Sequence, residues 1–326
     1  MEIKNAILHI IKSDGSPSVY SERELDIDSD VCEDFINKHV KKLWNSPTVR
    51  EAVFNTDSSV YQALKGYINR EVDFKDLSFT LGKRLSEIVN RYDDIPPSDF
   101  MIVRFDVKYD QFLAMFKFNY NECFTHETGG ESNNLVKCRT VLPSSGGKVE
   151  AACLIPFSPM LVKVIEESRN IDGEAVSYFS QLFLECETNL SRKEVAQIIS
   201  EVTNEFVHEY FDGDIKTHAL VKTAMTEEAE EAEGIVSMDN VAARVFEDES
   251  LKHNFVHTLR EAGIVEDIPL GAKFVKQQFG VQRFKANNGI DIKFPAELIA
   301  DEGQMEIEPH SDSSVTLTFK RLRVRD

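Results

Sequence analysis

Apolar and polar residues alternate in three short stretches near the C-terminal end of the chain. Residues 289–294 place Ile290, Ile292 and Phe294 on one side of an extended chain and charged residues on the other. Residues 305–308 and 315–319 repeat this period of two, which is typical of strands that are buried on one face only. The pattern predicts a small antiparallel meander with one packed face and one hydrated face.

A different pattern, with apolar residues three or four positions apart, predicts helices in the rest of the chain. Ser191 and Glu194 have the spacing of a capping box and indicate a helix start. The helical stretches are residues 30–45, 61–68, 74–88, 174–211, 239–246 and 251–262.

Between these helices, runs rich in Val, Ile, Phe and Tyr predict paired strands. The densest pair, residues 100–109 and 112–120, predicts a buried hairpin. The other predicted hairpins join residues 133–142 to 149–157, and residues 2–12 to 19–27.

This order of elements predicts an α+β fold in which an antiparallel sheet packs with helices in the N-terminal part. We expect an N-terminal α+β domain at residues 1–168, a helical segment with an acidic linker at 169–234, and a C-terminal α+β domain with the meander at 235–326. Residues 226–234 contain five Glu and no basic residue, which fits a linker, an exposed helix end or a docking strip for a basic protein.

Composition and charge argue against several classes of protein. The net charge of −19 repels a polyanion at long range. No run of 18 apolar residues is present and the N-terminus does not have the pattern of a signal peptide, so we expect a cytoplasmic protein without a membrane span. Five cysteines without a C-x-x-C pair favour buried free thiols over disulfides or a zinc ribbon.

The basic residues are concentrated at the C-terminal end. Residues 270–326 carry nine Lys and Arg against eight Asp and Glu, a net charge of +1, which leaves −20 for the remainder. Lys and Arg are the usual partners of DNA phosphates, although a solvated strand end is an equally good interpretation of such a cluster. The candidate nucleic-acid contacts are Lys273, Lys276, Arg283, Lys285, Lys293, Lys320, Arg321, Arg323 and Arg325.

Catalytic and metal-binding patterns are weak. His253 and His257 stand four residues apart on a predicted helix, a spacing that suits two metal ligands but is more often a solvated helix face. No nucleophile elbow or phosphate loop occurs in the required strand and helix context. We therefore predict no catalytic residue, no metal and no cofactor.

The chain resembles, over most of its length, the NdpA (YejK-type) nucleoid-associated proteins of bacteria. The segments that carry the resemblance are residues 3–12, 73–85, 100–118, 178–195, 289–294 and 315–319. The resemblance implies a cytoplasmic, non-enzymatic protein that accompanies the nucleoid and has no cofactor. It does not imply any particular residue as a DNA contact.

Three functional hypotheses follow from the sequence. The first is a non-enzymatic, nucleoid-associated protein that contacts double-stranded DNA directly or through DNA-bound complexes, as a monomer or a homo-oligomer. The second is an acidic interaction module that docks on DNA-processing or other nucleoid proteins. The third is an unrecognised metal-dependent hydrolase.

Overall fold

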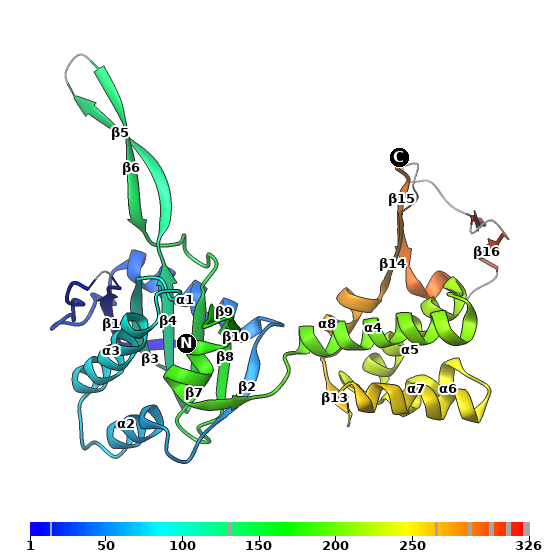
Figure 1. Cartoon of the computed structure of the whole chain (residues 1–326), viewed down its shortest axis with the longest axis horizontal. Helices are drawn as coiled ribbons and strands as arrows, with labels where there is room; N and C mark the ends of the chain where they lie inside the picture. The colour runs from blue at the N-terminus through cyan, green and yellow to red at the C-terminus, as the bar shows by residue number, and fades with distance from the viewer. Residues whose placement is uncertain are drawn as a thin grey trace. The chain divides into compact units, whose positions relative to one another are not determined.

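The computed structural model describes residues 1–13, 15–129, 132–264, 267–285, 289–299, 303–310 and 314–321 (Figure 1). Its contacts divide the chain into two compact units, Met1–Ser191 and Arg192–Asp326. Helices and antiparallel sheets occur in both units, which confirms the predicted α+β class.

Unit 1 is built on a seven-stranded antiparallel sheet whose order does not follow the sequence. From one edge to the other the strands are β1 (Glu2–Ile11), β3 (Ser98–Val107), β4 (Asp110–Asn119), β7 (Ala151–Pro156), β8 (Val162–Glu166), β2 (Arg50–Phe54) and β11 (Cys186–Thr188). The predicted buried hairpin is confirmed as β3 and β4, which pair in register from Ser98↔Asn119 to Val107↔Asp110.

Helices cover both faces of this sheet. On one face, α1 (Asp30–Asn45) packs on Met101, Val103 and Phe105 of β3. On the other face, α2 (Ser59–Ile68), α3 (Phe74–Arg91) and the π-helix η1 (Phe179–Leu184) pack on Phe100 and Ile102. Because both faces are dry, the central strands are apolar at nearly every position instead of alternating.

The three predicted helices of unit 1 are confirmed, and local chemistry explains where two of them begin. The Ser58 hydroxyl accepts a hydrogen bond from the Tyr61 amide at the start of α2, and the Asp73 carboxylate accepts one from the Asp76 amide at the start of α3. Each cap satisfies a backbone donor that the helix itself leaves unpaired.

A buried ion pair lies inside unit 1. The fully buried Lys117 ammonium on β4 donates to Glu150, Asn119 and the Pro96 carbonyl at 2.9–3.0 Å. Arg169 donates to the second oxygen of Glu150 at 2.8 Å. Burial lowers the pKa of Lys117 to about 8, against the opposing effect of Glu150. The cluster satisfies each buried charge with a partner.

Two hairpin predictions for unit 1 are wrong because strands pair with partners distant in sequence. β1 pairs with β3, and the described residues of the hairpin predicted for residues 2–27 keep just the bridge between Ile10 and Val19 and a hydrogen bond from the Leu25 amide to the Ala6 carbonyl. Likewise β7 pairs with β4 and β8. The residues of β7 are apolar on both faces of the strand. An interior position in the sheet, with a hydrophobic core on each face, buries both sets.

The strand that was expected to pair with β7 forms a hairpin of its own. β6 (Ser132–Val141) pairs with β5 (Asn121–Gly129), and this two-stranded hairpin projects from unit 1 (Figure 1). Cys123 stands opposite Cys138 across it. All five cysteines are free, but Cys123 is exposed, so the expectation of burial is correct for Cys153 and Cys186 and wrong for Cys123.

The predicted helix over residues 174–211 is correct only in its second part. The first part contains β10 (Glu174–Val176), which pairs with β9 (Arg169–Ile171), then η1 and β11. The α-helix α4 begins at Arg192, directly after the buried Ser191, and ends at Phe211.

Unit 2 is a helical core followed by two hairpins. Phe206, Phe246 and Phe255 contact one another at the centre of the core, with ring centroids 5.2–5.5 Å apart. Helices α6 and α7 confirm the two predicted after residue 238, whereas α5 and α8 were not predicted. The elements are α4, α5 (Ile215–Glu231), β12 (Ile235–Val236), α6 (Met238–Val245), α7 (Glu249–Glu261), β13 (Ile268–Pro269) and α8 (Ala272–Phe279).

Two glycines permit a close backbone approach in unit 2. A Cβ at Gly234 would lie 2.7 Å from the Gly271 Cα, and both glycines have φ near +90°. The Gly271 amide donates to the Gly234 carbonyl at 2.8 Å. This contact connects the end of α5 to the start of α8, where a side chain would not fit.

The acidic run is the C-terminal part of α5 and not a linker. Glu228 is buried and accepts hydrogen bonds from Asn240 and from Arg244 of α6. Arg244 also pairs with Glu231 at 2.6 Å, and this pairing lowers the pKa of Glu231. A basic residue outside the run therefore offsets part of its charge.

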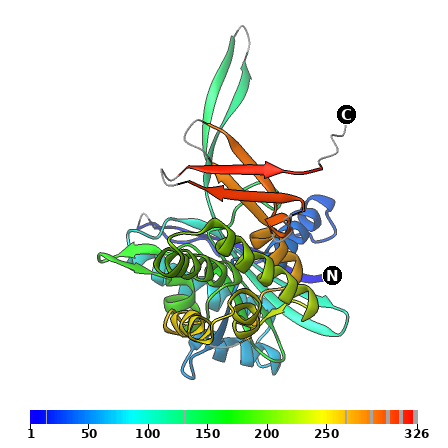
Figure 2. The same ribbon diagram turned by 90° about the vertical axis from the view of Figure 1, so that its right-hand side faces the viewer.

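The predicted meander is two separate hairpins. β14 (Val281–Lys285) pairs with β15 (Asp291–Pro295), and β16 (Met305–Pro309) pairs with β17 (Val315–Phe319), with the short helix η2 (Ala296–Ile299) between them. In Figure 2 the red β16–β17 hairpin runs across the orange β14–β15 hairpin. β14 was not predicted from the sequence. β15, which was expected to pair with β16, pairs instead with β14, the strand before it in the chain.

Candidate nucleic-acid interface

The outer face of β14–β15 gathers three of the nine predicted basic residues. Gln282 and Phe294 point inward and are buried, so the alternate positions Arg283, Lys285 and Lys293 face solvent. Arg283 and Lys293 are direct cross-strand partners. We call Arg283, Lys285, Lys293 and Asp291 the basic face.

One acid lies on the basic face. Asp291 accepts two hydrogen bonds from the Arg283 guanidinium, one of them at 2.7 Å. This pairing lowers the pKa of Asp291 and raises that of Arg283. Among the described residues no carboxylate forms an ion pair with Lys285 or Lys293, so the face keeps an excess of positive charge.

The remaining predicted residues are distributed over other elements. Lys273 and Lys276 are exposed on α8, and Lys276 pairs with Glu230 at 2.9 Å. Lys320 follows β17 and pairs with Glu306 of β16, while Arg321 is exposed with φ of 58°. Arg323 and Arg325 lie outside the described residues.

The outer face of β16–β17 has the opposite character. Glu306 and Glu308 stand opposite Thr318 and Thr316 and are exposed. We call these four residues the acidic face. The outward residues of β14–β15 are therefore mainly basic and those of β16–β17 acidic or neutral, with Asp291 and Lys320 as the exceptions.

Helix α5 contacts the inner face of the β14–β15 hairpin, opposite the basic face. The half-buried Lys222 ammonium donates to the Gln282 side chain at 3.0 Å, directly beside Arg283 in β14. Burial lowers the pKa of Lys222. His218, one turn earlier, has its pKa lowered to about 4, first by burial and then by Lys222. Neither residue was a candidate from the sequence, because no helix was predicted over residues 215–231.

The histidine pair on α7 has the geometry of a solvated helix face. His253 and His257 are exposed, with ring centroids 6.1 Å apart, and His257 lies 3.5 Å from Glu261. Within the described residues no group of three or more His, Cys, Asp and Glu side chains is placed to hold a metal ion. The same part of the chain contains no helix long and apolar enough to cross a membrane.

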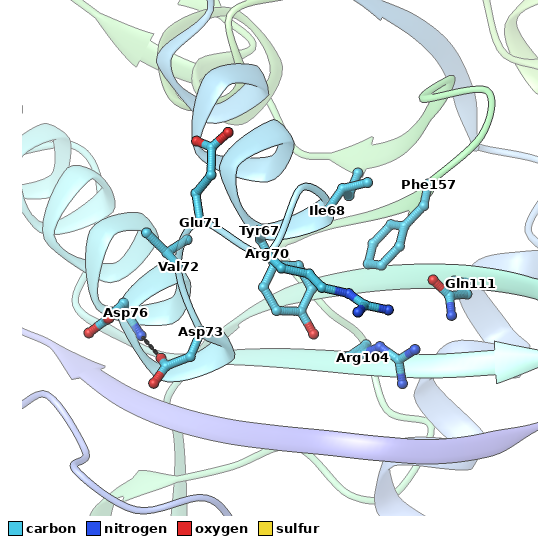
Figure 3. Close-up of a pocket in the computed structure, with 10 residues that line it drawn as sticks. All are labelled: Tyr67, Ile68, Arg70, Glu71, Val72, Asp73, Asp76, Arg104, Gln111 and Phe157. Carbon is cyan, nitrogen blue, oxygen red and sulfur yellow. Dashed lines mark hydrogen bonds between the residues drawn. The ribbon is translucent and has the colours of Figure 1, made fainter.

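Unit 1 contains a cavity of about 480 Å³ that the sequence analysis did not predict. Arg70, Arg104 and Gln111 lie on one side of it, around the Tyr67 and Phe157 rings (Figure 3). Glu71, Asp73 and Asp76 belong to the same lining. The residues come from the end of α2 and the segment that joins it to α3, the start of α3, the paired strands β3 and β4, and the position directly after β7, so their proximity depends on the tertiary fold.

Comparison with known proteins identifies the family. A family model described as nucleoid-associated protein YejK matches residues 7–323, nearly the whole chain. No curated protein matched the chain. The chain belongs to the YejK family of nucleoid-associated proteins, as the resemblance predicted, and this membership implies a cytoplasmic location at the nucleoid.

Proposed function

We propose that this protein binds double-stranded DNA at the nucleoid, without catalysing a reaction, through the basic face of β14–β15. The observation that carries the proposal is the grouping of Arg283, Lys285 and Lys293 on one exposed surface of a chain with a net charge of −19. Family membership supports the nucleoid setting.

The charge distribution determines what kind of binding this face supports. Long-range repulsion by the acidic remainder slows the encounter with DNA, so affinity depends on short-range contacts. Two lysines and one arginine on a two-stranded ribbon suit phosphate contacts along the DNA backbone. We therefore expect weak, sequence-independent binding that depends steeply on salt.

The salt dependence tests this proposal. If the three cations each contact a phosphate, the logarithm of the binding constant should fall with the logarithm of salt concentration with a slope of roughly −3. The double variant Arg283→Glu with Lys293→Glu should bind duplex DNA at least about tenfold more weakly and show a slope smaller by about two.

A matched control separates the basic face from total charge. Lys252→Glu with Arg260→Glu makes the same change in net charge on α7, where both residues already pair with acids. It should leave the slope near that of the unaltered protein. Equal losses in both variants, or no binding of the unaltered protein at low salt, would contradict the proposal.

A second candidate function rests on the acidic face. Glu306 and Glu308 present carboxylates on an exposed ribbon, which suits a basic protein partner bound to DNA. Capture from lysate before and after nuclease treatment distinguishes the two functions. A partner that persists without DNA and is lost in Glu306→Gln with Glu308→Gln supports the protein-docking function.

No observation in the described residues favours the metal-dependent hydrolase hypothesis. The described residues contain no group of three or more His, Cys, Asp and Glu placed to hold a metal ion, and the buried Lys117 and Glu150 pair with each other and with other protein groups.

A further inference from the structure

The cavity of unit 1 has the size and the lining of a small-molecule site. Its volume of about 480 Å³ lies within the usual range for pockets that hold small ligands. The Tyr67 and Phe157 rings, with centroids 5.9 Å apart, form an apolar wall. Polar side chains stand around that wall.

Hydrogen-bond donors are concentrated on one side of the cavity. Figure 3 shows the Arg70 side chain extending toward Arg104 and Gln111. Arg104 is mostly buried, and its one ion pair within the described residues is with Asp106 at 3.3 Å. A guanidinium has five N–H donors, so this pair does not saturate it. No hydrogen bond or ion pair of the Arg70 guanidinium occurs within the described part of the chain.

The carboxylates of the lining are directed elsewhere. Asp73 accepts the backbone amide of Asp76 at 2.8 Å as the cap of α3, and Glu71 points away from the two guanidinium groups in Figure 3. Within the described residues, Asp106 is therefore the one carboxylate at ion-pair distance from these guanidinium groups, and it pairs with Arg104 and not with Arg70.

The backbone conformation at Arg70 is a second, separate observation about this residue. Helix α2 ends in a Schellman motif, in which the Glu71 amide donates to the Gly66 carbonyl at 2.8 Å and the Arg70 amide to the Tyr67 carbonyl at 3.0 Å. Arg70 occupies the left-handed position of this motif with φ of 64°, where glycine is strongly preferred. An arginine there is strained, and it lines the cavity.

We propose that this cavity binds a small organic anion, whose carboxylate or phosphate group is held between the guanidinium groups of Arg70 and Arg104. Both anions match the planar fork of arginine donors, and Gln111 adds an amide donor. The lining contains three acidic residues and two arginines, and this excess of negative charge disfavours a polyanion. The aromatic wall holds the organic part of the ligand.

Three probes distinguish the sources of the anion: succinate, glycerol phosphate and inorganic phosphate. Each is titrated into the full chain by calorimetry, and into a thermal-unfolding assay at constant ionic strength with chloride as reference. Binding of succinate alone assigns a carboxylate ligand. Binding of either phosphate assigns a phosphate ligand, and binding of all three assigns a site for both groups.

Two variants test the residues. Arg70→Gly should weaken binding about tenfold or more, since it removes a charge-assisted hydrogen bond. It should not lower the unfolding temperature of the free protein, because glycine suits the left-handed backbone. Arg104→Gln keeps a polar side chain on β3 and should weaken binding to a similar extent.

Lys108→Gly is the matched control. Lys108 is also a basic residue at a left-handed position, with φ of 57°, and it does not belong to the cavity lining. This variant should bind the probes as the unaltered protein does. The proposal is overturned if none of the three probes binds, or if Arg70→Gly and Lys108→Gly bind equally well.

Discussion

The two hairpins of unit 2 resemble each other on the inside and differ on the outside. Phe294 of β15 and Met305 of β16 belong to one apolar cluster, together with Ala219 of α5. Outward, β14–β15 presents the basic face and β16–β17 presents the acidic face. The same alternating pattern therefore packs two ribbons on one core and gives them opposite surface charge.

This difference shows which property of a strand is determined by packing. Inward positions are restricted to apolar residues because they share a core. Outward positions are free of that restriction, so their charge reflects function or solubility. A test of the comparison must therefore change the shared core and the two outer faces separately.

The largest effect should come from the shared core. Phe294 contacts Phe284 of its own hairpin and Phe319 of the other, with ring centroids 5.6 and 5.4 Å apart. Phe294→Ala should lower the free energy of unfolding of unit 2 by roughly 3–5 kcal/mol, because it removes a large side chain from both contacts. Denaturant unfolding measures this loss.

Val281→Ala is the control for that experiment. Val281 belongs to β14 but its side chain is exposed, so the substitution should change the free energy by less than about 0.5 kcal/mol. If Phe294→Ala costs no more than Val281→Ala, the two hairpins do not share a core.

The sequence predicted most inward and outward positions correctly and strand partners poorly, and Ile290, which was expected on the packed side, is exposed because it precedes β15. Ile292, Phe294, Leu317 and Phe319 all belong to the apolar cluster, as the period of two required. The partner of β15 was missed because Val281–Lys285 gives a weak strand signal. Its two apolar residues, Val281 and Phe284, do not alternate with a period of two. Pairing depends on loop geometry and tertiary contacts, which periodicity does not encode.

Prediction of the candidate sites from the sequence was limited in the same way, because residue types do not show which residues lie together in the fold. A count of basic residues found Arg283, Lys285 and Lys293, but only the β14–β15 register places them on one face. Arg70 and Arg104 are 34 positions apart in numbering and line the same cavity only because α2 packs against the sheet. The left-handed backbone of Arg70 gives no signal in its residue type.

A smaller effect should follow from protonation of His218, which precedes Ala219 on α5. Its pKa is lowered to about 4 in the folded protein, first by burial and then by Lys222. Between pH 6.5 and 4 the unfolded chain takes up a proton that the folded protein excludes. The free energy of unfolding should therefore fall as pH falls through this range, by up to about 2 kcal/mol after allowance for solvent screening.

Comparison with His218→Gln isolates this contribution from the carboxylates that titrate in the same range. The difference in unfolding free energy between the two proteins should be constant above pH 6.5 and should change between pH 6.5 and 4. Parallel curves over the whole range would show that His218 is not responsible.

Conversion of the acidic face should have a moderate effect on DNA binding. Glu306→Lys with Glu308→Lys gives β16–β17 the charge sign of β14–β15, so affinity for duplex DNA should rise several-fold at low salt. Glu249→Lys with Glu261→Lys on α7 changes the net charge equally. A similar gain in both variants would mean that total charge, and not the hairpin, determines affinity.

The smallest effect should come from the one acid on the basic face. Asp291 holds the Arg283 guanidinium, and both side chains are exposed, so their ion pair contributes little to folding. Asp291→Asn should leave the unfolding temperature unchanged within error, yet it frees Arg283 for a phosphate. Affinity for DNA should rise about twofold to threefold, with a steeper salt dependence, in a filter-binding or anisotropy titration.

Asp239→Asn is the control, since it frees Arg260 on α7 in the same way. An equal gain from that control would show that the basic face has no special part in binding.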